Sequence, residues 1–370
     1  MFLSSISLKN TRKHTDTHID FAHKLNYIVG GNGVGKTTVL EAIYYLCTTK
    51  SCLTQSDAEV VKVGEADFKI TGKFNGRTNN DVQINYSATE NKKAFFLSNK
   101  QLHKFSDVIG KFPVVLLSPS DHSITQGYPA ERRKFVDSVI SQASRTYLNL
   151  LLEYNRILKQ RSSLLNRMKE LNRTEDQELN AWNEKLVQTG TEIINHRKTF
   201  VLEFTTYIND SYQKILGNKE EPEISYYFLK GRCDGEIEKC FSSLLNLRKE
   251  DELRRASNLV GPHRDDFILD INNMNLKSFG SQGQHKTFQT ILRFAEYFYL
   301  RDKTETSPIF LLDDVFGELD AERAAAISNY LSTVGQAFIT LTDFGNFSFL
   351  KAGNGDKIIK ITKDSKIVYA

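Results

Sequence analysis

Short apolar runs alternate with turns in the first third of the chain. Residues 25–29 (LNYIV) have the mostly apolar character of a buried strand. A glycine-rich stretch follows, and residues 36–46 then place apolar side chains at helical spacing. This order of strand, loop and helix predicts the start of an α/β unit.

Apolar and polar residues alternate in two later segments, 68–74 and 82–86. Between them lie the turn residues Asn-Gly at 75–76 and Asn-Asn at 79–80. The pattern predicts antiparallel strands.

From about residue 130 to about residue 253 the pattern is helical. Apolar residues between Tyr147 and Met168 recur in alternating steps of four and three, and Arg161 fills the one gap. About three heptads suit a helical hairpin better than a long coiled coil. A weaker pattern beginning at Trp182 predicts the returning helix, and residues 201–215 form another apolar-periodic stretch.

The last third of the chain returns to an α/β pattern. Residues 266–271 alternate like a strand, and residues 287–300 have helical spacing. Two short apolar runs, 309–312 and 337–341, suit buried parallel strands.

The composition indicates a folded protein of two or three domains, because 40% of its 370 residues are hydrophobic and 25% are charged. No apolar run approaches the ~20 residues of a membrane span, and the first residues lack the pattern of a signal peptide. We therefore expect a cytoplasmic protein without a membrane partner. Its four cysteines are expected to be reduced and not to hold a metal.

Positive charge is concentrated in one stretch, although the net charge of the whole chain is only +4. Residues 131–173 contain ten basic and four acidic residues, an excess of six positive charges. Such a stretch either neutralises the phosphates of a nucleic acid or forms the solvated face of a helix.

The glycine-rich stretch fits the phosphate-loop pattern G-x-x-x-x-G-K-[ST]. Its backbone N–H groups would surround phosphates, with a lysine at the β- and γ-phosphates and a hydroxyl ligand for Mg²⁺. The alternative is a glycine-rich turn followed by lysine and threonine by chance. The pattern therefore predicts ATP and Mg²⁺ as cofactors. The candidate ATP-binding residues are Gly30, Gly31, Asn32, Gly33, Val34, Gly35, Lys36, Thr37 and Thr38.

The apolar run 309–312 ends in two carboxylates, Asp313 and Asp314. A carboxylate at such a strand end is able to hold the Mg²⁺ of a bound nucleotide, and a second one is able to activate water. We assign Asp313 to the metal together with Thr37, and Asp314 to the base. The alternative for Asp314 is a helix N-cap.

A second candidate phosphate site precedes the predicted helix 287–300. Ser281, Gly283 and Gln284 offer a hydroxyl and a flexible backbone at a helix N-terminus. One γ-phosphate does not need two such sites, but two chains packed head to tail would each give this segment to the other's nucleotide. The alternative is an ordinary serine N-cap.

Taken in order, these motifs resemble those of ABC-type ATPases. In that comparison Leu319-Asp320 resembles the D-loop at a dimer interface. Lys36 and Asp313 are 277 positions apart, a separation too long for a transporter cassette and too short for long coiled-coil arms. With the segments 127–137 and 261–266, the chain resembles the RecF family of bacterial recombination mediators. It departs from the ABC pattern at Thr342, where a switch histidine would be expected, and this suggests slow hydrolysis.

The resemblance implies an α/β fold, with an ABC-type P-loop ATPase head and an inserted α-helical lobe. The head would combine a mixed sheet with an antiparallel β subdomain. Its two parts would be residues 1–112 and 255–370, and the lobe residues 113–254.

For function, the resemblance implies an ATP-dependent homodimer that binds double-stranded DNA at single-strand gaps. With RecO and RecR it would help to load RecA in recombinational repair, replication restart and SOS induction. A weak ATPase, with Lys36, Asp313 and Asp314 in catalysis, would open the dimer and release DNA.

Among the basic residues, Arg132, Arg133 and Lys134 are the candidate DNA contacts. The two arginines have the alternative of structural ion pairs with neighbouring acids. Two rival functions share the nucleotide motifs: an ABC-type ATPase for another partner, such as a transporter, and a nucleotide-dependent protein scaffold with little direct DNA binding. A steep salt dependence of DNA affinity would separate a DNA-binding protein from a scaffold.

Overall fold

The computed structural model divides the chain into two compact units. The first unit comprises residues 1–121, 210–219 and 289–370, and the second comprises residues 122–209 and 220–288. The limits of these two units differ from the domain boundaries expected from the sequence, at residues 112/113 and 254/255. Those domain boundaries stay a prediction. The residues described are 1–76, 78–217, 220–318, 321–343, 345, 353–363 and 365–369.

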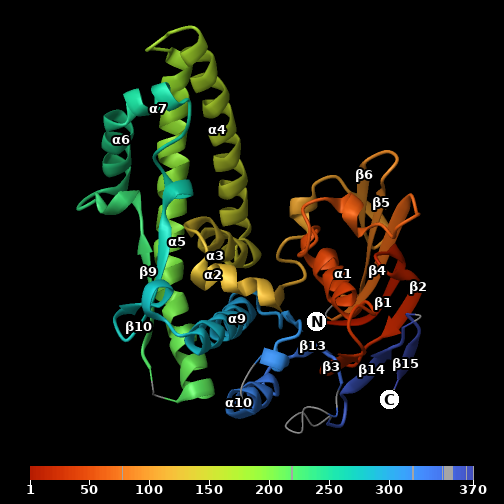
Figure 1. The fold of residues 1–370 in the computed structure, drawn as a ribbon. Helices are drawn as coiled ribbons and strands as arrows, with labels where there is room; N and C mark the ends of the chain where they lie inside the picture. Colours follow the sequence, from red (N-terminus) through yellow and green to blue (C-terminus); the bar gives the residue numbers. More distant parts are fainter. Residues whose placement is uncertain are drawn as a thin grey trace. The chain divides into compact units, whose positions relative to one another are not determined.

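An antiparallel sheet of six strands forms one layer of the first unit (Figure 1). The predicted strands 68–74 and 82–86 are confirmed, because they form its neighbouring strands β4 and β5. Its strands, in spatial order, are β2 (His14–Asp20), β1 (Phe2–Thr11), β4 (Asp67–Asn75), β5 (Asn80–Ser87), β6 (Lys92–Leu97) and β7 (Lys100–Leu102).

A second six-stranded sheet of the first unit is parallel except for its edge strand β15. The three apolar runs predicted as buried strands are β3, β12 and β13 of this sheet. Carboxyl ends of parallel strands meet at one edge, where open α/β sheets bind ligands. The spatial order is β15 (Ile367–Tyr369), β14 (Lys357–Ile361), β3 (Leu25–Val29), β13 (Gln336–Leu341), β12 (Ile309–Leu312) and β8 (Val114–Leu117).

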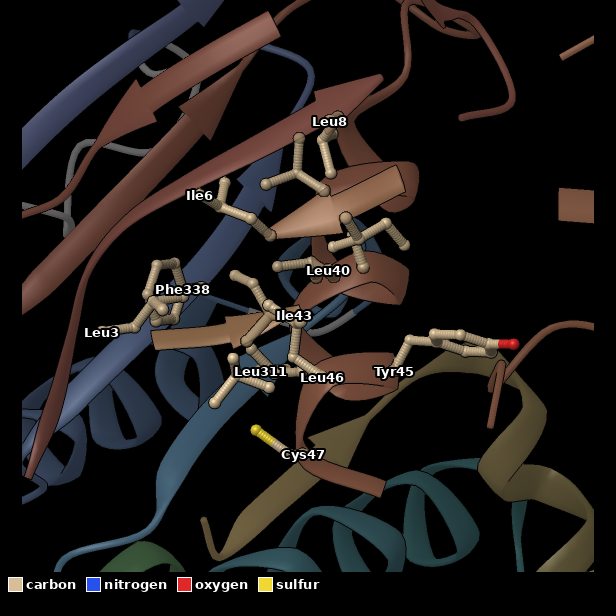
Figure 2. Packing of buried hydrophobic residues seen from close by; sticks show 14 of the residues in the cluster. Leu3, Ile6, Leu8, Leu40, Ile43, Tyr45, Leu46, Cys47, Leu311 and Phe338 are labelled. Atoms are coloured by element: carbon tan, nitrogen blue, oxygen red, sulfur yellow. The ribbon is translucent and has the colours of Figure 1, made fainter. Parts of the chain in front are cut away.

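Helix α1 (Lys36–Thr48) lies between these two sheets and has buried residues on nearly all its sides. Leu40, Ile43 and Leu46 share one hydrophobic core with Ile6 of the first sheet and Leu311 of the second (Figure 2). A helix that is apolar around its circumference is stable only when it is covered on both faces. The core therefore fixes the helix that begins at the phosphate loop.

A buried side chain links the two sheets of the first unit. The amide of Gln336, at the start of β13, accepts a hydrogen bond from the Leu3 N–H at 2.7 Å. It donates to the carbonyls of Leu3 and Ala22 at 2.8 and 2.7 Å. These bonds satisfy backbone groups that would otherwise be buried without partners.

The remaining elements of the first unit are mostly short. Helix α9 (Gln282–Thr304), which contains the predicted helix 287–300, lies partly in each unit. The others are α10 (Ala321–Leu331) and the 3₁₀ turns η1 (Asp57–Val60), η2 (Phe105–Asp107), η3 (Pro119–Asp121) and η6 (Phe316–Glu318).

The second unit contains a helical hairpin, as the sequence predicts. Helices α4 (Arg145–Glu170) and α5 (Gln177–Leu216) lie side by side and share an apolar cluster near their connection (Figure 1). The last residues of α5, from Asp210, belong to the first unit. A three-stranded antiparallel sheet has the order β11 (Met274–Asn275), β10 (Asp266–Ile271) and β9 (Pro222–Tyr227). The other elements are α2 (His122–Gln126), α3 (Pro129–Ala143), η4 (Leu229–Gly231), α6 (Ile237–Leu247), α7 (Lys249–Arg255), η5 (Pro262–Arg264) and α8 (Leu276–Phe279).

Helix α5 is longer than the sequence pattern indicates, because the two predicted stretches are one helix of 40 residues. Gly190 lies in its interior without ending it. A Cβ at this position would lie 2.5 Å from the Phe241 ring, so the glycine allows α6 to approach closely. Among the described residues, neither α5 nor any other helix has the length and apolar composition to cross a membrane.

Two of the four cysteines form a disulfide, so the expectation that all are reduced is wrong for this pair. Cys233 and Cys240 are bonded, with their Cα atoms 5.4 Å apart. The turn before α6 and the first turn of that helix bring them together. Cys47 and Cys52 are free thiols, and burial raises the pKa of Cys52 to about 12.

Candidate nucleotide site

The phosphate loop connects the end of β3 to the start of α1. Gly33 and Gly35 have φ values of 74° and 106°, a region that side chains with a Cβ rarely adopt. Helix α1 begins at Lys36, and its first turn contains no acidic residue. The free N–H groups and positive dipole of this helix end therefore favour an anion.

Lys36 bends back over this loop. Its Nζ donates to the carbonyls of Gly30 and Gly31 at 2.8 and 2.9 Å. Burial lowers the pKa of Lys36, while the nearby carboxylates of Asp314 and Asp313 act in the opposite direction. An ammonium held by neutral carbonyls is able to exchange them for phosphate oxygens, which bind it more strongly.

Thr37 and Asp313, the pair predicted to hold Mg²⁺, are in contact. Thr37 Oγ1 donates to Asp313 Oδ1 at 3.0 Å. Burial raises the pKa of Asp313, and hydrogen bonds from Thr340 and Thr37 act in the opposite direction. A hydroxyl and a carboxylate beside a phosphate loop are the oxygen ligands that Mg²⁺ prefers, so these residues fit the ion.

Thr340 belongs to the same cluster, and the sequence analysis did not single it out. Its Oγ1 donates to Asp313 Oδ1 at 2.8 Å and accepts from the Asp314 N–H at 2.9 Å. The only signal in the sequence is a hydroxyl near the end of the apolar run 337–341. Its role depends on the pairing of β13 with β12, which no local pattern reveals.

Asp314 follows β12 with its backbone in the left-handed region, at φ 51°. This conformation is uncommon for a residue with a side chain and concentrates at functional sites. The carboxylate is exposed, and the 3₁₀ turn η6 begins only at Phe316. Asp314 is therefore not the residue before a helical turn, and its geometry suits a group that meets water.

The predicted second phosphate site lies at the start of α9, in the second unit. Ser281 Oγ accepts from the Gln284 N–H at 3.2 Å, and the Gln284 side chain accepts from the Ser281 N–H at 2.9 Å. This reciprocal pair is a capping box, which matches the N-cap alternative. Ser281 remains exposed and Gly283 partly exposed. Leu319-Asp320 lies outside the described residues, and Thr342 is exposed after β13.

The three candidate DNA contacts differ in their surroundings. Arg132 is 7% exposed and donates to both carboxylate oxygens of Asp266, at 2.8 and 2.9 Å. Arg133 donates to the Asp265 carbonyl at 2.6 Å, whereas Lys134 is exposed. Arg132 therefore forms an ion pair inside the second unit, as in the structural alternative, whereas the bond of Arg133 is to a backbone carbonyl. The DNA role of the three residues stays a prediction.

Comparison with known proteins places these motifs in a family. The family described as "RecF/RecN/SMC N terminal domain" matches residues 2–368. The chain is 40% identical over 361 residues to the DNA replication and repair protein RecF of Chloroherpeton thalassium, covering 95% of this chain and 97% of that protein. The chain belongs to the RecF family. RecF of Salinibacter ruber is 36% identical over 357 residues, with 94% and 86% covered.

Solved structures agree with the RecF family and with the predicted fold class. The recombination mediator protein RecF of the RecFOR pathway, solved with ATP, has a TM-score of 0.89 at 29% identity, with 100% of this chain and 97% of that chain covered. The Smc head domain of Pyrococcus furiosus has a TM-score of 0.59 at 13% identity, with 100% and 96% covered, a likeness of fold alone. The predicted ABC-type ATPase fold is thereby confirmed.

Proposed function

We propose that this chain is an ATP-dependent, dimerising DNA-binding ATPase that acts as a recombination mediator. In this proposal it binds double-stranded DNA at single-strand gaps in the cytoplasm. With RecO and RecR it helps to load RecA in repair, replication restart and SOS induction. The observation that supports the proposal most is the contact of Thr37 with Asp313 beside the phosphate loop.

The proposed reaction begins with ATP phosphates in the loop that ends at Gly35. Lys36 leaves the carbonyls of Gly30 and Gly31 and binds the β- and γ-phosphates. Thr37 and Asp313 would hold Mg²⁺, and the ion would supply positive charge that neutralises these phosphates. Asp314 orients the attacking water and accepts its proton. The water oxygen bonds to the γ-phosphorus as the bond to the β–γ bridging oxygen breaks, and ADP and phosphate are the products.

A second copy of the chain completes the proposed site. Its Ser281, Gly283 and Gln284 would present the N-terminus of α9 to the γ-phosphate, as the order of motifs implies. ATP would thus join two heads, and hydrolysis would separate them and release DNA. The absence of a histidine at Thr342 supports slow hydrolysis.

For the DNA contact, one face of α4 supports the proposal better than the paired arginines of α3. Arg145, Arg156, Lys159 and Arg167 are exposed. At 3.6 residues per turn they fall within an arc of about 80°, which also contains one exposed acidic residue, Glu170. Arg167 also pairs with Glu178 at 3.1 Å. We call these four residues the α4 basic face, which suits the regular phosphates of a duplex.

Sedimentation with and without ATP tests the nucleotide part of the proposal. The wild-type chain should dimerise with ATP, and Lys36→Ala should remain monomeric because it loses the cation at the phosphates. Lys9→Ala, an exposed lysine of β1 outside the phosphate loop, is the control and should dimerise. Normal dimerisation of Lys36→Ala would contradict the proposed coupling.

A further inference from the structure

The turn between β1 and β2 lies against the phosphate loop and was not singled out in the sequence. Arg12, on one side of the turn, donates two hydrogen bonds to the Glu41 carboxylate of α1, at 3.1 and 2.9 Å. The Glu41 side chain is only 2% exposed. The Arg12 N–H also bonds to the Val60 carbonyl at 2.8 Å. The turn is therefore fixed to the helix that follows the loop.

His14, on the other side of the turn, contacts the loop itself. It is fully buried, with Nε2 3.1 Å from the Gly35 carbonyl and Nδ1 3.0 Å from Thr17 Oγ1. A carbonyl only accepts, so Nε2 bears the proton and Nδ1 accepts from the threonine hydroxyl. Burial lowers the pKa of His14, which agrees with a neutral ring. A Cβ at Gly35 would lie 2.6 Å from Nε2, so only glycine fits here.

Lys13 lies between these two fixed residues, and its side chain points to the loop. Its Nζ donates to the Gly33 carbonyl at 2.5 Å, and the residue is exposed. A lysine ammonium has three donors, so this bond leaves further N–H groups to offer. Because Arg12 and His14 hold the backbone, this ammonium stays at the rim of the phosphate loop.

We propose that Lys13 is a second nucleotide-binding cation, which donates to phosphate oxygens of ATP in the loop beside Lys36. The inference rests on the proposed function and adds a residue from outside the phosphate-loop motif. A triphosphate retains negative charge after Lys36 and one divalent ion have bound. A second ammonium within reach of the loop compensates part of that charge.

Equilibrium binding of a fluorescent ATP analogue, without hydrolysis, tests this role. Lys13→Ala should raise the Kd about tenfold, the effect expected for one exposed charge-assisted hydrogen bond. Lys13→Gln should weaken binding similarly although its amide is able to bond to Gly33, whereas Lys13→Arg should keep most of the affinity. A purely structural lysine predicts instead that both variants keep the affinity, because glutamine and arginine are each able to donate to the Gly33 carbonyl.

The matched control is Lys9→Ala, since Lys9 is an exposed lysine of β1 that lies opposite Asp16 and Lys69 in the sheet. It should leave the Kd unchanged. Equal Kd values for Lys13→Ala and the wild type would overturn the inference. Lys36→Ala separates the two proposals. If both Lys36→Ala and Lys13→Ala bind the ATP analogue as tightly as the wild type, the proposed function fails. If Lys36→Ala binds it weakly and Lys13→Ala binds it normally, only the role of Lys13 fails.

Discussion

Arg161 is a charged residue in an apolar pattern, and the structure explains it. The residue is 1% exposed, and its guanidinium donates to Glu252 at 2.7 Å and to Asn183 at 2.9 Å. It also bonds to Asn258. These groups connect α4 with α5, with α7 and with the segment after α7. Arg161 therefore interrupts the apolar heptad pattern because it is the centre of a buried polar network.

Removal of this arginine should destabilise the protein strongly. We expect Arg161→Ala to lower the free energy of unfolding by about 3–5 kcal/mol, because the buried Glu252 carboxylate loses its cationic partner and keeps only the bond from the Leu259 N–H. Urea unfolding measures this. Arg156→Ala, exposed on the same helix, should change the value by less than about 0.5 kcal/mol. Similar losses in both variants would contradict the network.

A buried carboxyl of α9 should make stability depend on pH. Burial raises the pKa of Glu296 to about 7, although Arg293 at 2.7 Å opposes this. An unfolded glutamate has a pKa of about 4.3. The folded state therefore holds the proton more tightly. This contribution to stability is complete below about pH 4.3 and decreases as the pH rises to about 7.

Comparison of the wild type with Glu296→Gln isolates this effect. Between pH 5 and pH 7 the free energy of unfolding of the wild type should decrease, relative to the variant, by up to about 1.4 kcal/mol per pH unit. Urea unfolding at several pH values measures the difference. Parallel pH profiles for the two proteins would show that Glu296 does not titrate in this range.

At the scale of elements, local sequence patterns predicted the features that depend on residues close together in the chain. The phosphate loop follows a strand and precedes a helix, so its geometry was predictable from residues 25–46. The contacts of Thr340, Lys13 and Gln336 were not predictable. Strand pairing brings Thr340 to its partner, and the packing of the two sheets brings Lys13 and Gln336 to theirs. Helix α5 was divided in two because its polar positions weakened the periodic signal.

The α4 basic face yields a prediction for DNA binding. Replacing Arg156 and Lys159 together with alanine should weaken duplex binding and lower the salt slope of log K by about 1.8, since each phosphate contact contributes about 0.9. Arg254→Ala with Lys239→Ala makes the same change in net charge at exposed residues paired with Asp251 and Glu236. An equal loss of slope in this control would show a non-specific effect of charge.

At the scale of the whole molecule, the order of motifs was more informative than any single motif. The phosphate loop, the segment at Ser281 and the pair Asp313-Asp314 predicted an ABC-type ATPase. Their spacing, with the segments 127–137 and 261–266, predicted the RecF family, which the family match over residues 2–368 confirms. The Cys233–Cys240 bridge was missed because expectation followed composition and compartment. Composition does not show which cysteines lie close enough in the folded chain to form a disulfide.

Duplex-DNA binding in three nucleotide states tests the central claim most directly. Fluorescence anisotropy with ATP, with ADP and without nucleotide, each at two salt concentrations, gives the affinities. The proposed function predicts tight binding with ATP alone and a marked loss at the higher salt concentration. DNA binding that is absent in all three states would contradict it and favour a nucleotide-dependent protein scaffold.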